Sequence, residues 1–302
     1  MADPRQRAAA LLIRSREHEQ ARNLKAAIAD VESAIAIDPS NARAFNELGI
    51  LLSDDRQLDR AIAAFTRATM IDPRYARAWN NLGTALRDAG RIEEALAAFE
   101  RATLADDRYA LAFANLGIAH RDTGNDARAA AAFTRALVID PRQRLALIAL
   151  AGLKRAEGAI DEAAALYEQA LSLEPHDGPT WLLYAGTLAE RDDVDTAVRA
   201  YAEAENRDRK LLRAVFGRHL TMPMVASDAQ AFSDARASFE RGLARVETDV
   251  PVRAAALRAE EVVDELRWTN FLLAYQGEDD RALQARFATM MARTVDAADS
   301  AL

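Results

Sequence analysis

The sequence predicts an all-α protein in which most of the chain is an array of helix pairs. Half of the 302 residues are apolar, chiefly alanine and leucine, and only 12 glycines and 8 prolines interrupt them. Such a composition favours closely packed helices over sheets. A pattern of large and small apolar residues also recurs every 34 residues. A period of this length indicates a stack of structural repeats.

Three consecutive repeats, 42–75, 76–109 and 110–143, carry the pattern most completely. Their shared residues are Phe45, Leu48, Gly49, Ala61, Phe65, Ala68 and Pro73, then Trp79, Leu82, Gly83, Ala95, Phe99 and Ala102, then Phe113, Leu116, Gly117, Ala129, Phe133, Ala136 and Pro141. Repeats 144–177 and 178–211 keep fewer of these residues, and 8–41 is degenerate. We therefore expect about six repeats within residues 1–211.

Each repeat is predicted to be an antiparallel helix pair. The glycine of the first helix lets the two backbones approach closely. Gly90, Gly124 and Gly158 are placed to end the first helix. Asp-Pro pairs end the second, because proline disfavours helix in the residue before it. Asp107 and Arg209 replace that proline in two repeats, and we expect the turn to form there as well.

The recurring residues match the pattern W-x2-L-G-x2-Y, A-x3-F and P, and the array resembles the tetratricopeptide repeat family. The resemblance implies a right-handed superhelix, or α-solenoid, that binds other proteins. It also implies a concave face lined by positions 2, 5, 6, 9, 12 and 13 of each repeat.

Asparagine is frequent at positions 5 and 6, where the chain has Asn46, Asn80, Asn81 and Asn115. An amide offers a donor and an acceptor, so such a column can pair with the backbone of an extended peptide. This arrangement resembles the asparagine ladder of O-linked N-acetylglucosamine transferases. The alternative is that asparagine is simply common at this place in the family.

Two further features mark the expected groove. Position 12 holds an arginine in three repeats, Arg87, Arg121 and Arg155. These side chains either bind a partner or form solvated ion pairs between repeats, each contributing about 0 to 1 kcal/mol. The groove then becomes apolar at Leu145, Ile148, Leu182 and Leu183. An apolar wall suits an amphipathic partner, unless the C-terminal segment covers these leucines.

Residues that carry chemistry are scarce. The chain has no cysteine, and its four histidines show no metal-ligand spacing. His120 stands where an aromatic residue normally packs, which favours a core role. There is no phosphate-binding glycine loop and no G-x-S-x-G motif. We expect no catalysis, no metal and no cofactor in this chain.

Charge and hydropathy restrict the partners. A net charge of −8 without a basic block argues against nucleic acid. No apolar run reaches the roughly 18 residues that span a bilayer. We expect a cytoplasmic protein whose partner is a protein or peptide, with no nucleic acid and no membrane.

The pattern fails after Leu211, so residues 212–302 form a second predicted region. We expect a loop around Pro223, a helix capped by Ser227 and Gln230, a long helix between Pro251 and Gly277, and a last helix. This region either caps the array or joins it to another domain.

The joining interpretation follows from a second resemblance. The segments ARASFERGL and WTNFLLAYQGEDDRALQARF, within 212–294, resemble the junction between repeats and catalytic domain in bacterial relatives of O-linked N-acetylglucosamine transferase, including flagellin-modifying enzymes. The resemblance implies an acceptor protein such as flagellin as partner, and a glycosyltransferase domain beyond Leu302. The alternative is a scaffold or co-chaperone that binds a peptide of an unrelated protein.

Cap and junction predict different surfaces. In both, Trp268, Phe271 and Leu272 are expected to be buried. A junction should also expose apolar residues of the last helix, with Phe287, Met290 and Met291 as candidates, and should self-associate through them.

Overall fold

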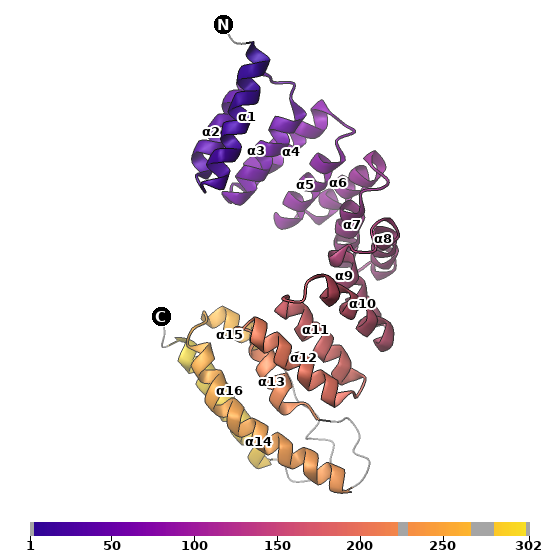
Figure 1. The fold of residues 1–302 in the computed structure, drawn as a ribbon, viewed down its shortest axis with the longest axis vertical. Helices are drawn as coiled ribbons and strands as arrows, with labels where there is room; N and C mark the ends of the chain where they lie inside the picture. Colours follow the sequence, from indigo (N-terminus) through magenta and orange to yellow (C-terminus); the bar gives the residue numbers. More distant parts are fainter. Residues whose placement is uncertain (1–2, 223–228, 267–280, 300–302) are drawn as a thin grey trace. The chain divides into compact units, whose positions relative to one another are not determined.

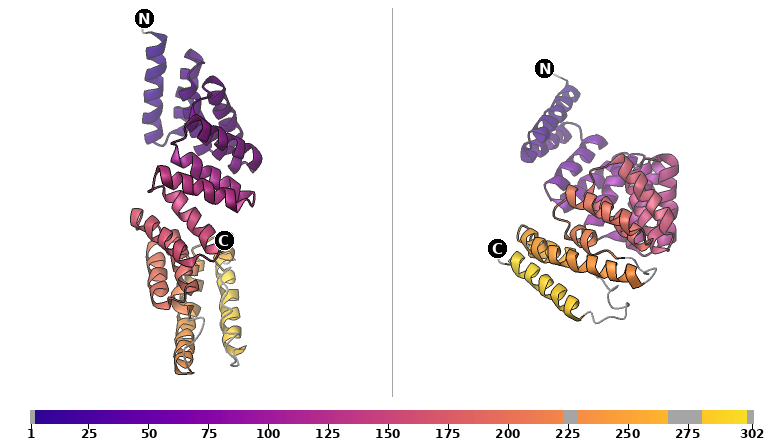
Figure 2. Two further views of the ribbon diagram at one scale, coloured as in Figure 1. Left: turned by 90° about the vertical axis from the view of Figure 1, so that its right-hand side faces the viewer. Right: turned by 60° about the horizontal axis from the view of Figure 1, so that its bottom comes forward.

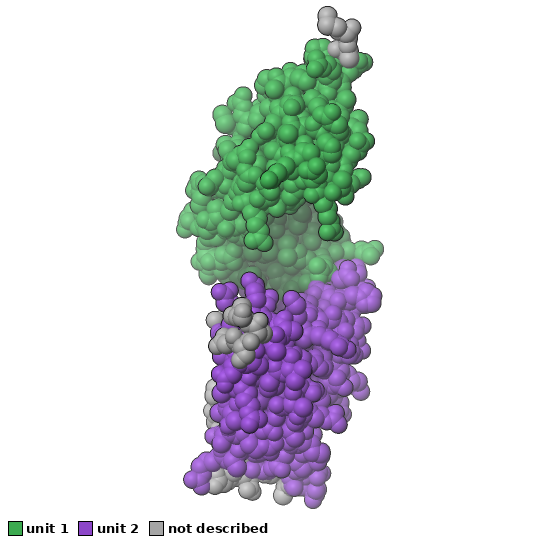
Figure 3. Space-filling model, turned by 90° about the vertical axis from the view of Figure 1, so that its left-hand side faces the viewer, with its two compact units in different colours: residues 1–149 green, residues 150–302 purple. Residues whose placement is uncertain are grey.

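The computed structural model describes residues 3–222, 229–266 and 281–299, and these form helices and turns with no strand. The all-α prediction is confirmed. The chain divides into two compact parts, residues 1–149 and 150–302, here called the N-terminal and C-terminal bodies (Figure 3). This division is not the domain boundary at 211/212 that the sequence predicted, and that boundary stays a prediction.

The N-terminal body is a series of helix pairs (Figure 1). Its helices are α1 (Pro4–Gln20), α2 (Leu24–Ile37), α3 (Ala42–Asp54), α4 (Leu58–Ile71), α5 (Ala76–Asp88), α6 (Ile92–Ala105), α7 (Ala110–Asp122) and α8 (Asp126–Ile139), and α9 (Arg144–Ala156) crosses the division. Helices α1, α3, α5 and α7 each pack on the second helix of their repeat, and α5 also contacts α3 and α7. Helices α3, α5 and α7 therefore share one layer.

The C-terminal body continues with the same kind of pair (Figure 2). It contains α10 (Ile160–Leu173), α11 (Gly178–Glu190), α12 (Val194–Arg207), α13 (Leu212–Leu220), α14 (Ala229–Ala254), α15 (Ala259–Glu265) and α16 (Arg281–Asp299). First helices begin 34 residues apart from Ala42 to Leu212. The helical spacing thus persists for one helix beyond the point where the side-chain pattern ends.

An aromatic ring covers the first-helix glycine in each of the three complete repeats. A Cβ atom built on Gly83 would lie 2.6 Å from the ring of Phe99, which is fully buried. Gly49 and Gly117 have the same relation to Phe65 and Phe133. The glycine therefore makes room for a ring of the facing helix, whereas the sequence had suggested close approach of the two backbones.

The turn after each first helix needs a left-handed residue. Gly90, Gly124 and Gly158 have φ values of 74°, 75° and 81°, as their predicted position at the helix end requires. The equivalent residues of other repeats are Arg22, Arg56 and Asp192, with φ between 57° and 63°. The register of the array holds these three residues in a conformation that side chains disfavour.

The turn after the second helix depends on aspartate more than on proline. The Oδ1 atom of Asp72 accepts a hydrogen bond from the backbone N–H of Arg74 at 3.0 Å. Asp106 and Asp208 make the same bond at 3.0 and 2.9 Å, in the two repeats where Asp107 and Arg209 replace proline. The turn therefore forms without the proline, as predicted.

The C-terminal helices enclose a core of their own. Its buried residues come from α13, α14 and α16 and the adjoining segments, and include Leu212, Phe216, Leu220, Phe239, Leu243, Val246, Val250, Leu283 and Met290. The buried carboxylate of Glu205 on α12 accepts hydrogen bonds from Arg218 and Arg253. This ionic cluster ties the last repeat to α13 and α14.

The predicted apolar surface on the last helix is wrong. Met290 is 1% exposed, and Phe287 and Met291 are half-buried against the C-terminal core. The rings of Phe287 and Phe216 meet edge to face with centroids 6.2 Å apart. The cause is the spacing of the apolar residues, which fall on one helical face that packs on α14. Trp268, Phe271 and Leu272 lie outside the described residues.

The helix predicted to begin at Pro251 is also wrong. Helix α14 continues through Pro251 to Ala254, and α15 begins only after Arg258. The buried residues Val250 and Ala254 lie one turn apart, so they hold the same apolar face on both sides of the proline. Ser227 and Gly277, expected to bound two helices, lie outside the described residues.

Gly83→Ala should lower the free energy of unfolding by about 1 to 3 kcal/mol, because the new methyl group would overlap the buried ring of Phe99. This is the net loss, after the gain of about 1 kcal/mol that alanine brings over glycine in helix propensity. Gly152→Ala is the control, since its Cβ would meet nothing closer than the Tyr167 hydroxyl at 3.7 Å. Urea denaturation of both variants checks the prediction, and equal stability would contradict it.

Gly242→Ala should disturb the contact between α13 and α14. A Cβ atom at residue 242 would fall on the backbone carbonyl oxygen of His219, which cannot rotate away as a side chain can. We expect a lower melting temperature than for Ser238→Ala, an exposed position of the same helix. If the Gly242→Ala protein has the same melting temperature as the wild type, the two helices do not touch at this residue.

Candidate functional site

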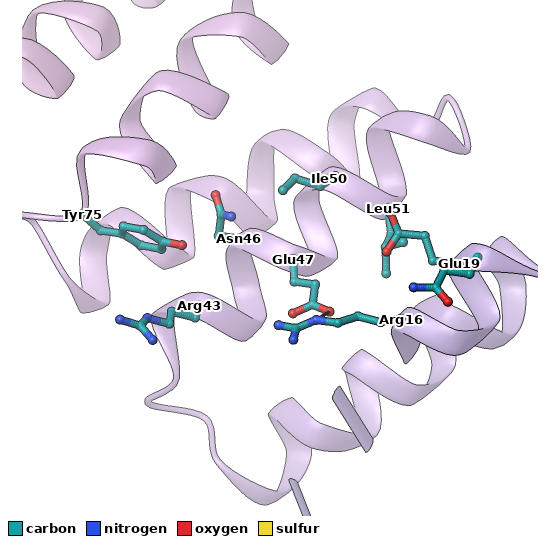
Figure 4. A pocket seen from close by; sticks show the side chains of 9 residues that line it. Arg16, Glu19, Arg43, Asn46, Glu47, Ile50, Leu51 and Tyr75 are labelled. Atoms are coloured by element: carbon teal, nitrogen blue, oxygen red, sulfur yellow. Dashed lines mark ion pairs between the residues drawn. The ribbon is translucent and has the colours of Figure 1, made fainter. Parts of the chain in front are cut away.

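A hollow of about 610 Å³ opens between α1 and α3 in the N-terminal body (Figure 4). Its lining residues are Arg16, Glu19, Gln20, Arg43, Asn46, Glu47, Ile50, Leu51 and Tyr75. Four of them occupy positions 2, 5, 6 and 9 of repeat 42–75, so the hollow belongs to the face that the resemblance implied. The sequence did not predict the part taken by α1, because the first repeat has lost the recognisable pattern.

Glu47 is the least satisfied charged group of this hollow. Burial raises the pKa of its carboxyl group, and the nearby Arg16 guanidinium only partly opposes this effect. The Nε atom of Arg16 lies 3.5 Å from Oε1 of Glu47, and this buried oxygen has no hydrogen-bond donor within the described part of the chain. The folded protein therefore keeps a carboxylate whose charge is incompletely compensated.

The predicted asparagines pair with one another between repeats. The Nδ2 atom of Asn81 donates to Oδ1 of Asn46 at 2.9 Å, and Nδ2 of Asn115 donates to Oδ1 of Asn80 at 2.8 Å. Asn46, Asn80 and Asn115 are buried, while Asn81 is half-buried. Part of the capacity of each amide is thus used to join neighbouring first helices.

The three predicted arginines differ in their surroundings. Arg155 binds Glu190 through two hydrogen bonds, one of them 2.9 Å long, and its guanidinium lies against Gly186. Arg87 approaches the carboxylate of Asp88 at 3.6 Å. Arg121 is exposed and has no ion pair with any residue that the structure describes. Arg155 therefore acts as a link between repeats, while Arg121 faces solvent.

The predicted apolar residues lie in different bodies. Ile148 is half-buried near the end of the N-terminal body. Leu182, in the C-terminal body, packs against the cluster of Ala204, Leu211 and Ala214, while Leu183 stays 37% exposed. Leu182 thus packs mainly within its own repeat, and Ala214 is the one member of this cluster from the segment after the repeats.

His120 and the potential metal ligands were the remaining candidates for chemistry in the sequence. His120 is buried, and burial lowers the pKa of its imidazole, as suits a neutral core residue. No group of three potential metal ligands comes together within residues 3–222, 229–266 and 281–299. None of the helices in these ranges combines the length and apolar character needed to cross a bilayer.

Solved structures share the fold at low sequence identity. Pseudomonas aeruginosa pilF matches with a TM-score of 0.61 and 24% identity, over 67% of this chain and 92% of its own. PilW, a type IV pilus biogenesis factor, gives 0.59 and 24%, over 66% and 92%. A tetratricopeptide repeat protein from Parabacteroides merdae gives 0.60 and 14%, over 95% and 99%. No curated protein matches the sequence.

Family models agree with this likeness. One model described as tetratricopeptide repeat matches residues 14–76, 46–107 and 80–144, and a second with the same description matches residues 154–215. Together they cover well over half of the chain. The chain therefore belongs to the tetratricopeptide repeat family, a family of scaffolds for protein interactions.

Proposed function

We propose that the N-terminal body binds an extended segment of a partner protein along its first helices, and that the hollow between α1 and α3 anchors this segment. The observation that carries the proposal is Glu47. A half-buried carboxylate without full compensation costs stability, and natural proteins retain such groups where binding needs them.

The hollow suits a short polar stretch of polypeptide with one basic side chain. A cationic group close to Glu47 would supply the missing compensation for its carboxylate. The 39% exposed side chain of Ile50, with Leu51 and Tyr75, offers an apolar surface beside this charge. The site thus combines a charge contact that fixes orientation with an apolar contact that contributes affinity.

The asparagines extend the proposed site along α3, α5 and α7. Asn46, Asn80, Asn81 and Asn115 use one group each in the pairs between repeats, and every amide has a further donor or acceptor for a peptide backbone. Arg87 and Arg121 stand at the ends of α5 and α7, where they can contact acidic or polar groups of the bound segment. Ile148 marks the far end of the proposed path in this body.

A narrower proposal concerns the partner. The resemblance of residues 212–294 to a glycosyltransferase junction supports an acceptor protein such as flagellin, with this chain as the non-catalytic part of a glycosylating system. The burial of Met290 removes the apolar docking surface that a junction was expected to show on α16. Flagellin that binds the wild type but not Glu47→Gln would support the narrower proposal, and flagellin that fails to bind would leave a general scaffold.

Glu47→Gln should raise the melting temperature at pH 7. The pKa of Glu47 is higher in the folded than in the unfolded protein. Below about pH 4 the carboxyl group is protonated in both states and costs no stability. As the pH rises through the folded-state pKa, the group ionises in the folded protein and the free energy of unfolding falls. The two proteins should therefore melt alike near pH 4 and diverge towards pH 7. Glu17→Gln, exposed on α1 outside the hollow, is the control. A less stable Glu47→Gln protein would show that its ion pair with Arg16 is structural.

The same variant tests binding. Short random peptides selected on the wild-type chain should include a group rich in lysine and arginine that Glu47→Gln no longer retains, while Glu17→Gln, outside the hollow, still retains most of them. Selected peptides that bind Glu47→Gln equally well would place the site elsewhere.

A double-mutant cycle should measure the asparagine pair. Asn80→Ala and Asn115→Ala each leave one buried amide without its partner, which costs about 1 to 3 kcal/mol of unfolding free energy. The double variant should lose less than the sum, with a coupling of about 0.5 to 3 kcal/mol. Strict additivity in urea denaturation would show that the pair does not form.

A further inference from the structure

Three large apolar side chains stand exposed at the same position of successive repeats. Met70, Leu104 and Val138 are 66%, 79% and 67% exposed, on α4, α6 and α8 of the N-terminal body. They are 34 residues apart and lie near the C-terminal end of the second helix. This side of each pair is separate from the first helices that carry the proposed peptide site.

The fold does not require an apolar residue at this position. The equivalent residues in the C-terminal body are Ser172 and Asn206, both exposed on helices of the same length and register. In the degenerate first repeat the position is Ala36, also exposed. The repeat fold therefore does not depend on a large apolar side chain at this position.

Arginines accompany each of these side chains. Arg67, Arg101 and Arg135 lie three residues earlier, on the same helical face. The guanidinium groups of Arg67 and Arg135 lie over the rings of Phe45 and Phe113, at 5.9 and 5.8 Å. Their charged ends are thus held close to the surface beside the apolar residue.

A second arginine follows each apolar residue by four positions, at the turn. These are Arg74, Arg108 and Arg142, all exposed. In the described chain none of the six arginines forms an ion pair with a carboxylate. The corresponding positions of the C-terminal body hold Gln169 and Glu203, and then His176 and Lys210, so the arginine pairs and the apolar residues are confined to the same three repeats.

Met70, Leu104 and Val138 with their six arginines are here called the stripe. Nearby carboxylates reduce its positive charge unevenly. Each turn carries an aspartate, such as Asp72, whose Oδ1 accepts a backbone hydrogen bond. The middle repeat adds Glu100 and Asp107, both exposed. The excess of positive charge is therefore greatest around Met70 and Val138.

We propose that this arginine and apolar stripe binds a partner-protein segment that presents aliphatic side chains together with carboxylates. Met70, Leu104 and Val138 supply apolar contact area. The guanidinium groups, which have no carboxylate partner in the described chain although Arg135 donates to the backbone oxygen of Asp107 at 3.4 Å, match carboxylates in paired hydrogen bonds. The repetition over three repeats suits an elongated segment. A protein segment is favoured over a lipid surface because no tryptophan, tyrosine or phenylalanine is exposed beside these residues, as membrane-surface binding usually requires.

The test compares the full wild-type chain with the triple variant Met70→Ser, Leu104→Ser, Val138→Ser. Serine is the residue that the chain itself has at 172, so the variant should fold and melt like the wild type. Short random peptides are selected on both proteins, with Ile13→Ser, an exposed apolar position outside the stripe, as control. Peptides that need the stripe should be rich in aspartate, glutamate and aliphatic residues, and should bind the triple variant about tenfold more weakly or worse.

A second variant separates charge from apolar contact. Arg67→Gln with Arg135→Gln introduces the residue that the chain itself has at the equivalent position, Gln169. This variant should weaken binding of the same peptides and reduce the loss of affinity as salt rises from about 0.05 to about 0.3 M. Glu47→Gln should leave their binding unchanged, which distinguishes this surface from the proposed peptide site.

Three results would overturn the proposal. The first is that the wild type and the triple variant select the same peptides, or that the peptides specific to the wild type are basic. The second is that phosphatidylserine vesicles sediment with the wild type but not with the triple variant, which would assign the stripe to lipid. The third is that the wild type forms a dimer in analytical ultracentrifugation that the triple variant does not, which would assign it to a second copy of the chain.

Discussion

The contact between a second-helix aromatic ring and a first-helix glycine is the constraint on which the array depends. Phe99 fills the space that a side chain of Gly83 would occupy, and Phe65 and Phe133 do the same in the flanking repeats. Because the ring sets the distance between the helices, these three pairs share one geometry and stack in one register. A different contact of the same kind joins the last repeat to the helix that follows it, where the ring of Tyr201 on α12 covers Gly217 on α13. It lies beside the hydrogen bond between Arg218 and Glu205, so both contacts hold α13 against α12.

Positions outside this packing are free to differ between repeats, and the chain uses them differently in its two bodies. In the N-terminal body they supply the hollow around Glu47 on the first helices and the stripe around Leu104 on the second. In the C-terminal body the corresponding residues are engaged internally, as Arg155 with Glu190 and Leu182 with Leu211 show. Residues 1–149 carry 21 basic and 20 acidic side chains, whereas residues 150–302 carry 18 and 27. The proposed binding surfaces thus coincide with the part of the chain that has no negative excess.

Errors in the sequence-based expectations concentrate after residue 211, for a common reason. Within the repeats, a residue packs against partners one helix away at a known spacing, so position alone indicates burial. In the last region, Phe287 packs on Phe216 and Arg286 pairs with Glu247. No periodic spacing in the sequence predicts these contacts. The continuation of α14 through Pro251 has the same origin, since the buried face on both sides of the proline outweighs the local preference for a break.

The sequence by itself determined the helix pairs, the 34-residue register and the left-handed turn at Gly90, because each depends on local residue preferences repeated many times. The resemblance to the repeat family further implied which columns line a concave face, and this assignment stays a prediction. Only the tertiary structure decided what those columns do: Asn80 accepts from Asn115 of the next repeat, Arg155 is held by Glu190, and α1 closes a hollow over Glu47. These outcomes depend on the distance and angle between neighbouring helices. A side chain's spacing in the sequence fixes the face on which it lies, but the adjacent helix determines whether that face meets water or another residue.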